Sequence, residues 1–148
     1  MKHLFASAMT ATLLATPLWA AGHASGDAEA GEDIFRQCKA CHAITDADGE
    51  DIQRGGKTGP NLWGVPGRVA GSDEGFKRYK DSIVEAGEAG LEWNEEDFVK
   101  YVQDPAAFLK EYLDDSGARS GMAFKLRDEE DALNIWAYLA SVSPEPES

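Results

Sequence analysis

The chain has 148 residues and a formal net charge of −13, from 27 acidic residues against 14 lysines and arginines. This length suits a single domain. The negative charge argues against binding to nucleic acid or to anionic membrane surfaces.

The first twenty residues have the features of a secretory signal peptide. Lys2 and His3 give a positive start, residues 4–19 are apolar and uncharged, and small alanines follow. The apolar run is shorter than the roughly 20 residues that cross a bilayer, so an uncleaved anchor is the less favoured interpretation. We expect a leader over residues 1–20, cleavage at about residues 20–24, and a periplasmic product.

The first predicted helix of the mature chain runs from Ser25 to about Cys38. Ala28, Gly31 and Phe35 recur at helical spacing. A glycine inside a helix costs about 1 kcal/mol relative to alanine. We therefore expect another helix to cross closely at Gly31; the alternative is a weak helix that tolerates the glycine.

This helix leads into Cys38-Lys39-Ala40-Cys41-His42, two cysteines separated by two residues and followed at once by a histidine. The pattern is typical of covalent attachment of a c-type haem. Each thiol adds to one vinyl group, and the histidine directly after the second cysteine is held beneath the iron. The sequence therefore predicts one haem c, bound through Cys38 and Cys41, with His42 as an axial ligand.

Other uses of two cysteines are a disulfide, half of a zinc site and a redox-active pair. A zinc site with four cysteine ligands is excluded because the chain has two cysteines. A mixed zinc site would need a second histidine pair, whereas His3 and His23 lie in the leader region. A redox pair does not require the histidine and normally accompanies a βαβ pattern, which we do not find.

A polar loop is predicted from Ala43 to Lys57, and the next segment, from Thr58 to Arg68, is rich in glycine and proline. We expect a backbone carbonyl of this second segment to accept the free ring N–H of His42, because metal-bound histidines almost always make such a bond. Arg68 is a candidate partner for a haem propionate, although an arginine is more often simply exposed.

Helical patterns then cover residues 73–87, a segment capped by Asn94, a segment that begins at Asp104-Pro105, and residues 128–142. The last pattern has acidic residues in its first turn and one apolar face. We expect it to pack on the first helix at Gly31.

Met122 is the methionine that remains once the leader, with Met1 and Met9, is removed. In an ordinary protein such a methionine fills a gap in the core. Here an iron held by His42 needs a sixth ligand, His23 lies at the frayed N-terminus, and lysine is an uncommon alternative. We therefore predict Met122 as the second axial ligand.

Together these features resemble class I c-type cytochromes, most closely the long soluble bacterial cytochrome c2, or cytochrome c-550, group. The resemblance implies an all-α cytochrome c fold, with four to five helices wrapped around one haem and with crossed N- and C-terminal helices. It implies one domain over residues 25–143 and a flexible tail over 144–148. It rests on matching segments across the mature chain: Gly31, Phe35, Cys-x-x-Cys-His, Lys57–Leu62, Gly67-Arg68, Trp93, Tyr101, Met122–Phe124, Ile135 and Tyr138.

The resemblance also implies roles for individual side chains. The Pro60 carbonyl accepts from His42, Arg68 and Trp93 bind one propionate, Ser120 replaces a threonine near the other, and Tyr101 lies near the methionine sulfur. Gly121 stands where most relatives have lysine, and this chain is acidic where many relatives are basic.

The function implied by the resemblance is that of a soluble, monomeric one-electron carrier rather than an enzyme. A cytochrome bc complex would be the donor, and a terminal oxidase or photosynthetic reaction centre the acceptor, through transient docking. Lys39, Lys57, Lys125 and Arg127 are candidate steering cations. The alternative is a haem c enzyme or ligand-binding sensor, which needs a displaceable sixth ligand and a distal acid or base.

Overall fold

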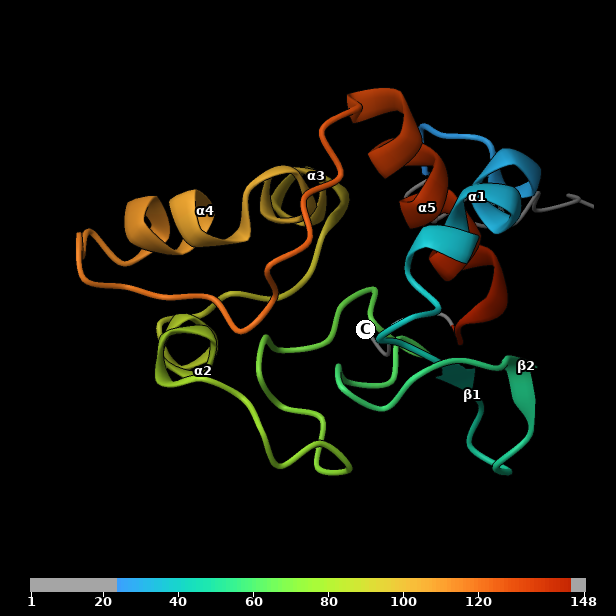
Figure 1. Cartoon of the computed structure of the whole chain (residues 1–148), viewed down its shortest axis with the longest axis horizontal. Helices are drawn as coiled ribbons and strands as arrows, with labels where there is room; N and C mark the ends of the chain where they lie inside the picture. Colours follow the sequence, from blue (N-terminus) through green and yellow to red (C-terminus); the bar gives the residue numbers. More distant parts are fainter. Residues whose placement is uncertain (1–23, 145–148) are drawn as a thin grey trace, which may run out of the picture.

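The structure, a computed structural model, describes residues 24–144 (Figure 1). The predicted leader, its first possible cleavage positions and residues 145–148 of the predicted tail lie outside the described residues. The elements in chain order are α1 (Ala28–Ile34), the 3₁₀ helix η1 (Phe35–Gln37), β1 (Ile44–Thr45), β2 (Asp51–Gln53), α2 (Asp81–Glu88), α3 (Glu95–Gln103), α4 (Pro105–Tyr112) and α5 (Glu129–Val142).

The first and last helices, α1 and α5, pack against each other (Figure 1). A Cβ atom added to Gly31 would lie 1.9 Å from the backbone oxygen of Asn134, so only glycine permits this approach. One turn later the rings of Phe35 and Tyr138 meet with centroids 5.8 Å apart. The predicted crossing of the terminal helices at Gly31 is confirmed.

Side-chain caps mark the start of four described helices: Asp27 accepts the N–H groups of Glu29 and Ala30 in α1, and the other three caps begin α3, α4 and α5. Asn94 accepts the N–H of Asp97 at the start of α3, and Asp128 does the same for α5. Asp104 ends α3 and caps α4, whose first residue is Pro105. These three helices begin where the sequence predicts them.

Two other helices differ from the prediction. The helix expected over residues 25–38 begins at Ala28 and tightens into η1 after Ile34. The pattern over residues 73–87 becomes helical only at Asp81. The carboxylate of Asp73 accepts the backbone N–H groups of Gly75 and Asn61, which holds the preceding residues in a turn.

The predicted loop from Ala43 to Lys57 contains the antiparallel pair β1–β2, in which Ile44 lies opposite Gln53. With strands of two and three residues, alternation of polar and apolar residues is too short to be detected. The fold is therefore mostly helical, with one small sheet. No helix within residues 24–144 is both long and apolar enough to span a bilayer.

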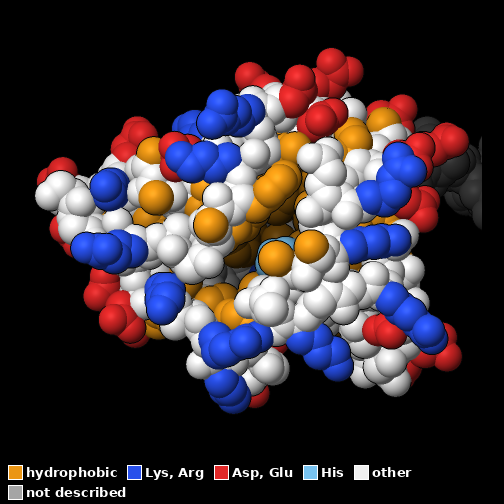
Figure 2. All heavy atoms as spheres, viewed as in Figure 1, with side chains coloured by type: hydrophobic (Ala, Val, Ile, Leu, Met, Phe, Trp, Pro, Cys, Tyr) orange, Lys and Arg blue, Asp and Glu red, His pale blue; other side chains and the backbone are white. Residues whose placement is uncertain are grey.

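The buried apolar side chains form two clusters. The larger joins η1, α3 and α5 and includes Phe35 and Leu139; the smaller joins α2 and α4 and includes Leu91 and Leu109. Two partly buried aromatic residues, Trp93 and Tyr101, pack against both clusters. Between them the face shown in Figure 2 is hollowed and lined with apolar side chains, and a histidine lies at its floor.

Candidate haem-binding site

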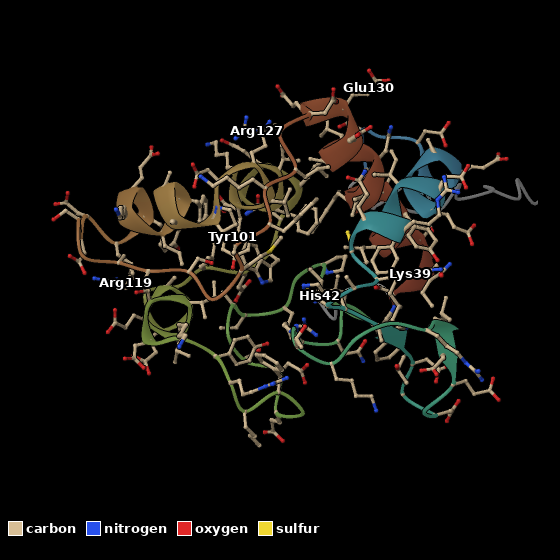
Figure 3. All side chains as sticks on the ribbon, viewed as in Figure 1. Lys39, His42, Tyr101, Arg119, Arg127 and Glu130 are labelled. Atoms are coloured by element: carbon tan, nitrogen blue, oxygen red, sulfur yellow. The ribbon has the colours of Figure 1, made fainter. Side chains whose placement is uncertain are left out.

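His42 lies at the centre of this face (Figure 3). Its Nδ1 lies 2.8 Å from the carbonyl oxygen of Pro60. Because a carbonyl only accepts, Nδ1 must carry the hydrogen, and Nε2 keeps its lone pair for a metal. Burial lowers the pKa of His42, the bond to Pro60 opposes that effect, and the charge of Arg68 adds to it. The ring is therefore neutral at neutral pH, as a metal ligand must be.

Gly59 packs directly on this imidazole. A Cβ atom added to Gly59 would lie 2.3 Å from Cε1 and 2.7 Å from Nδ1 of His42. A Cβ atom on Gly55 would lie 1.8 Å from the His42 backbone oxygen, and one on Gly56 would lie 2.3 Å from that of Ala40. The glycines thus let residues 55–60 wrap closely around the motif, a role that their turn-forming tendency did not indicate.

The two cysteines do not form a disulfide with each other. They lie on one turn, since the N–H groups of Cys41 and His42 donate to the Cys38 carbonyl over 3.0 and 2.9 Å. Cys41 is exposed, whereas burial, and then the neighbouring Cys41, raise the pKa of the Cys38 thiol to about 11. Both sulfurs therefore come from the segment that also carries His42.

Met122 lies on an extended segment, residues 119–127, which we call the strap. Its side chain is partly buried and packs against the larger apolar cluster. Its N–H donates to Oγ of Ser120 over 3.0 Å, and this oxygen lies 3.3 Å from the hydroxyl of Tyr101. Burial raises the pKa of Tyr101, and the bond with Ser120 opposes the shift. Tyr101 on α3 therefore helps fix the strap beside the methionine.

Both ends of the strap are also anchored. The N–H of Arg119 donates to Oγ of Ser82 on α2 over 3.0 Å. The N–H of Leu126 donates to the Val102 carbonyl on α3 over 2.8 Å. The strap is therefore held by α2 at one end and by α3 near the other end.

Known proteins resemble this chain over most of its length. The cytochrome c2 of Rhodovulum adriaticum is 58% identical over 119 residues, which cover 80% of this chain and 94% of the relative. The chain belongs to the cytochrome c2 family. The cytochrome c-550 of Paracoccus denitrificans is 44% identical over 147 residues, covering 98% of this chain and 91% of the relative. No family model matches the chain.

Solved structures of cytochrome c2 also share the fold. A crystal structure of cytochrome c2 from Rhodobacter sphaeroides is 54% identical, with a TM-score of 0.80. It covers 82% of this chain and is itself covered completely. The predicted cytochrome c fold is thereby confirmed, and membership of the cytochrome c2 family implies a covalent haem c and a role in electron transport.

Arg68 provides a test of whether these residues fit a haem. The half-buried guanidinium donates to the carbonyl oxygens of Trp63 and Asn61, over 3.1 and 2.9 Å. Burial lowers its pKa, while Tyr79 and Asp73 raise it. No ion pair joins Arg68 to a carboxylate within residues 24–144. A half-buried cation without a paired anion fits a cofactor that carries carboxylates.

Trp93, the other predicted propionate ligand, lies against Tyr101 with ring centroids 5.0 Å apart. Both rings therefore border the region between the clusters. The structure brings the predicted site residues together in smaller groups. His42 contacts Pro60, Trp93 contacts Tyr101, and Tyr101 reaches Met122 through Ser120.

The candidate steering cations differ in their surroundings. Nζ of Lys125 lies 2.6 Å from a carboxylate oxygen of Asp104, so its charge is already paired. Lys57 and Arg127 are exposed, and Lys39 is half-buried beside the cysteines. No ion pair is found for Lys39, Lys57 or Arg127 in the described part of the chain. Sequence position alone did not separate Lys125 from the other three.

Proposed function

We propose that this protein is a soluble periplasmic one-electron carrier, rather than an enzyme, with a haem c held by Cys38 and Cys41 and ligated by His42 and Met122. The observation that carries the proposal is the imidazole of His42, fixed by Pro60 with Nε2 free, beside two cysteines on the same turn. Haem c supplies a reversible one-electron change at its iron.

Groups of the protein set the reduction potential of the haem iron. The Pro60 carbonyl orients His42 and strengthens its donor nitrogen. The thioether of Met122 is a weak donor, and this ligation raises the reduction potential relative to two histidines. With the haem bound, the apolar clusters would shield it from water, and Arg68 would offset the negative charge of a propionate.

Trp93 adds a second donor toward the propionate bound by Arg68, and Ser120 lies toward the other. Tyr101 acts on Met122 through the Ser120 hydroxyl, which accepts the methionine N–H. In this proposal these residues position the ligand and the cofactor, and none of them takes part in a chemical reaction.

We further propose transient docking to membrane complexes, with a cytochrome bc complex as donor and a terminal oxidase or photosynthetic reaction centre as acceptor. Figure 2 shows lysine and arginine side chains around the hollow, whereas acidic side chains lie mainly at the edge of this face. This arrangement lets an acidic protein present a cationic rim, which steers a partner without requiring tight binding. The carrier itself would be a monomer.

The absorption spectrum of the oxidised holoprotein tests the ligation. We expect a sulfur-to-iron charge-transfer band in the red region, its loss in Met122→Ala, and its retention in Phe124→Ala, an exposed residue of the same strap. Absence of the band from the wild-type protein at neutral pH would instead support a haem c enzyme or sensor with an open sixth position.

Electron transfer is tested separately with membranes from the source organism. Reduced protein should be oxidised by those membranes, and oxidised protein should be reduced when a donor substrate is added. If the protein shows the charge-transfer band but is neither oxidised nor reduced by the membranes, the proposed ligation would stand and the proposed function would be wrong.

A further inference from the structure

The carbonyl group that accepts the ring of His42 belongs to a peptide group that is bound at both ends. Pro60 supplies the oxygen, which lies 2.8 Å from Nδ1 of His42. Asn61 supplies the N–H of the same peptide group, which donates to Oδ2 of Asp73 over 3.1 Å. A carboxylate, a peptide group and an imidazole therefore form one hydrogen-bonded chain, and all four residues are half-buried.

The carboxylate of Asp73 is held in one orientation. Its other oxygen, Oδ1, accepts the N–H of Gly75 over 2.9 Å, which closes a turn of the backbone. Arg68 is close enough to respond to the charge of Asp73, but its guanidinium donates to the carbonyl oxygens of Trp63 and Asn61. No ion pair joins Asp73 to a cation within residues 24–144. The N–H of Asn61 therefore meets a carboxylate oxygen that no cation contacts in this part of the chain.

Asn61 is also held in place without Asp73. Its side-chain oxygen accepts the N–H groups of Thr45 and Trp63, over 3.0 and 3.1 Å. Its side-chain nitrogen donates to the carbonyl oxygen of Thr45 over 2.7 Å. These bonds fix the position of the peptide group against β1, so the main contribution of Asp73 to it is a negative charge.

The peptide group transmits the effect of this charge to the imidazole. Because the C–N bond has partial double-bond character, a carboxylate bound to the N–H moves electron density toward the carbonyl oxygen. Hydrogen bonds in such a chain strengthen one another by about 10–30% each. A more negative oxygen of Pro60 attracts the Nδ1 hydrogen of His42 more strongly, which leaves more electron density on Nε2. A stronger donor nitrogen stabilises ferric iron relative to ferrous iron.

We propose that Asp73 is a positioning residue for the electron carrier, which strengthens the bond from His42 to Pro60 through the peptide group and so lowers the reduction potential. This inference rests on the proposed ligation of the haem iron by His42. The effect opposes that of the Met122 thioether, which raises the reduction potential. The potential is then a balance between a strengthened nitrogen donor and a weak sulfur donor.

Asp73→Asn tests the inference in the holoprotein. Asparagine forms the same turn with the N–H of Gly75, but the substitution removes the charge and leaves one oxygen where the carboxylate has two. At a fixed electrode potential, we expect the ratio of reduced to oxidised protein to rise by up to about fivefold. The Nδ1–H resonance of His42 in the reduced protein should move upfield, because its hydrogen bond is weaker.

The matched control is Glu74→Gln, which removes the same charge from the next residue of the turn, where the side chain is exposed. This variant should leave the His42 resonance in place and change the ratio less than Asp73→Asn does. Equal changes in the ratio, or an unmoved resonance in Asp73→Asn, would overturn the proposal. If the ring protons of His42 in the wild-type protein are not shifted by the haem ring current, the proposed ligation is wrong as well, so the two failures are distinguishable.

Discussion

Replacing Gly59 with alanine tests how the axial histidine is held. The added Cβ would lie 2.3 Å from Cε1 of His42, whereas ordinary contacts begin at 3.4 Å, so one group must move by about 1.1 Å. Metal–ligand distances tolerate only about 0.2 Å. Gly59 has no positive φ, so the backbone itself accepts alanine and the contact alone is changed.

We expect Gly59→Ala to keep the haem attached, since Cys38 and Cys41 are untouched. Overpacking costs about 1–3 kcal/mol, and the free energy of unfolding should fall by that amount. The displaced imidazole should also convert part of the oxidised protein from low-spin to high-spin iron. Urea unfolding and the absorption spectrum of the oxidised holoprotein measure the two effects.

The matched control is Gly75→Ala. Gly75 is exposed, and its added Cβ would meet only the Asp73 side chain, at 3.1 Å. We expect a change within about 0.5 kcal/mol and an unaltered spectrum. If Gly59→Ala behaved like this control, the close contact would not constrain the ring and the reasoning from it would be wrong.

Three further predictions concern the second ligand, the rim and the helix crossing. Met122→Ala should leave the haem attached and lower the reduction potential, as measured by redox titration; an unchanged potential would remove this residue from the site. Lys39→Glu should slow oxidation by partner membranes mainly at low salt, because exposed charges are screened beyond about 8 Å at 0.15 M. Lys125→Glu should slow this oxidation less than Lys39→Glu does, since the charge of Lys125 is already paired. Equal effects of the two variants would argue against a steering role for Lys39. Gly31→Ala should lower the free energy of unfolding by about 1–3 kcal/mol in urea despite its better helix propensity, and a more stable variant would show that α1 and α5 separate easily.

Three helices that the sequence predicts well begin at a side-chain cap formed within their first turn. Asn94, Asp104 and Asp128 each cap a helix with a bond to a residue three positions later, and such spacing is visible in the sequence. Before α2, Asp73 accepts the N–H of Gly75 and the N–H of Asn61. The bond to Gly75 is a local turn pattern, whereas the bond to Asn61 joins two segments and leaves no sign in the sequence around residue 73.

The same distinction applies to the site. The bond between His42 and a carbonyl of the Thr58–Arg68 segment was predictable because metal-bound histidines need such a partner. The packing of Gly59 on the ring was not, because glycine has many uses and the close approach appears only when the segments meet. The pairing of Lys125 with Asp104 likewise joins residues that are 21 positions apart.

The division of the core into two apolar clusters has a consequence for stability. Each of the two clusters is small, and within residues 24–144 only Trp93 and Tyr101 pack against both. A rigid apolar haem ring bound between the clusters would contact both of them and join the two cores into one. Because that ring would stay attached to Cys38 and Cys41 in the unfolded chain, it would stabilise the native state through the apolar surface that it buries there.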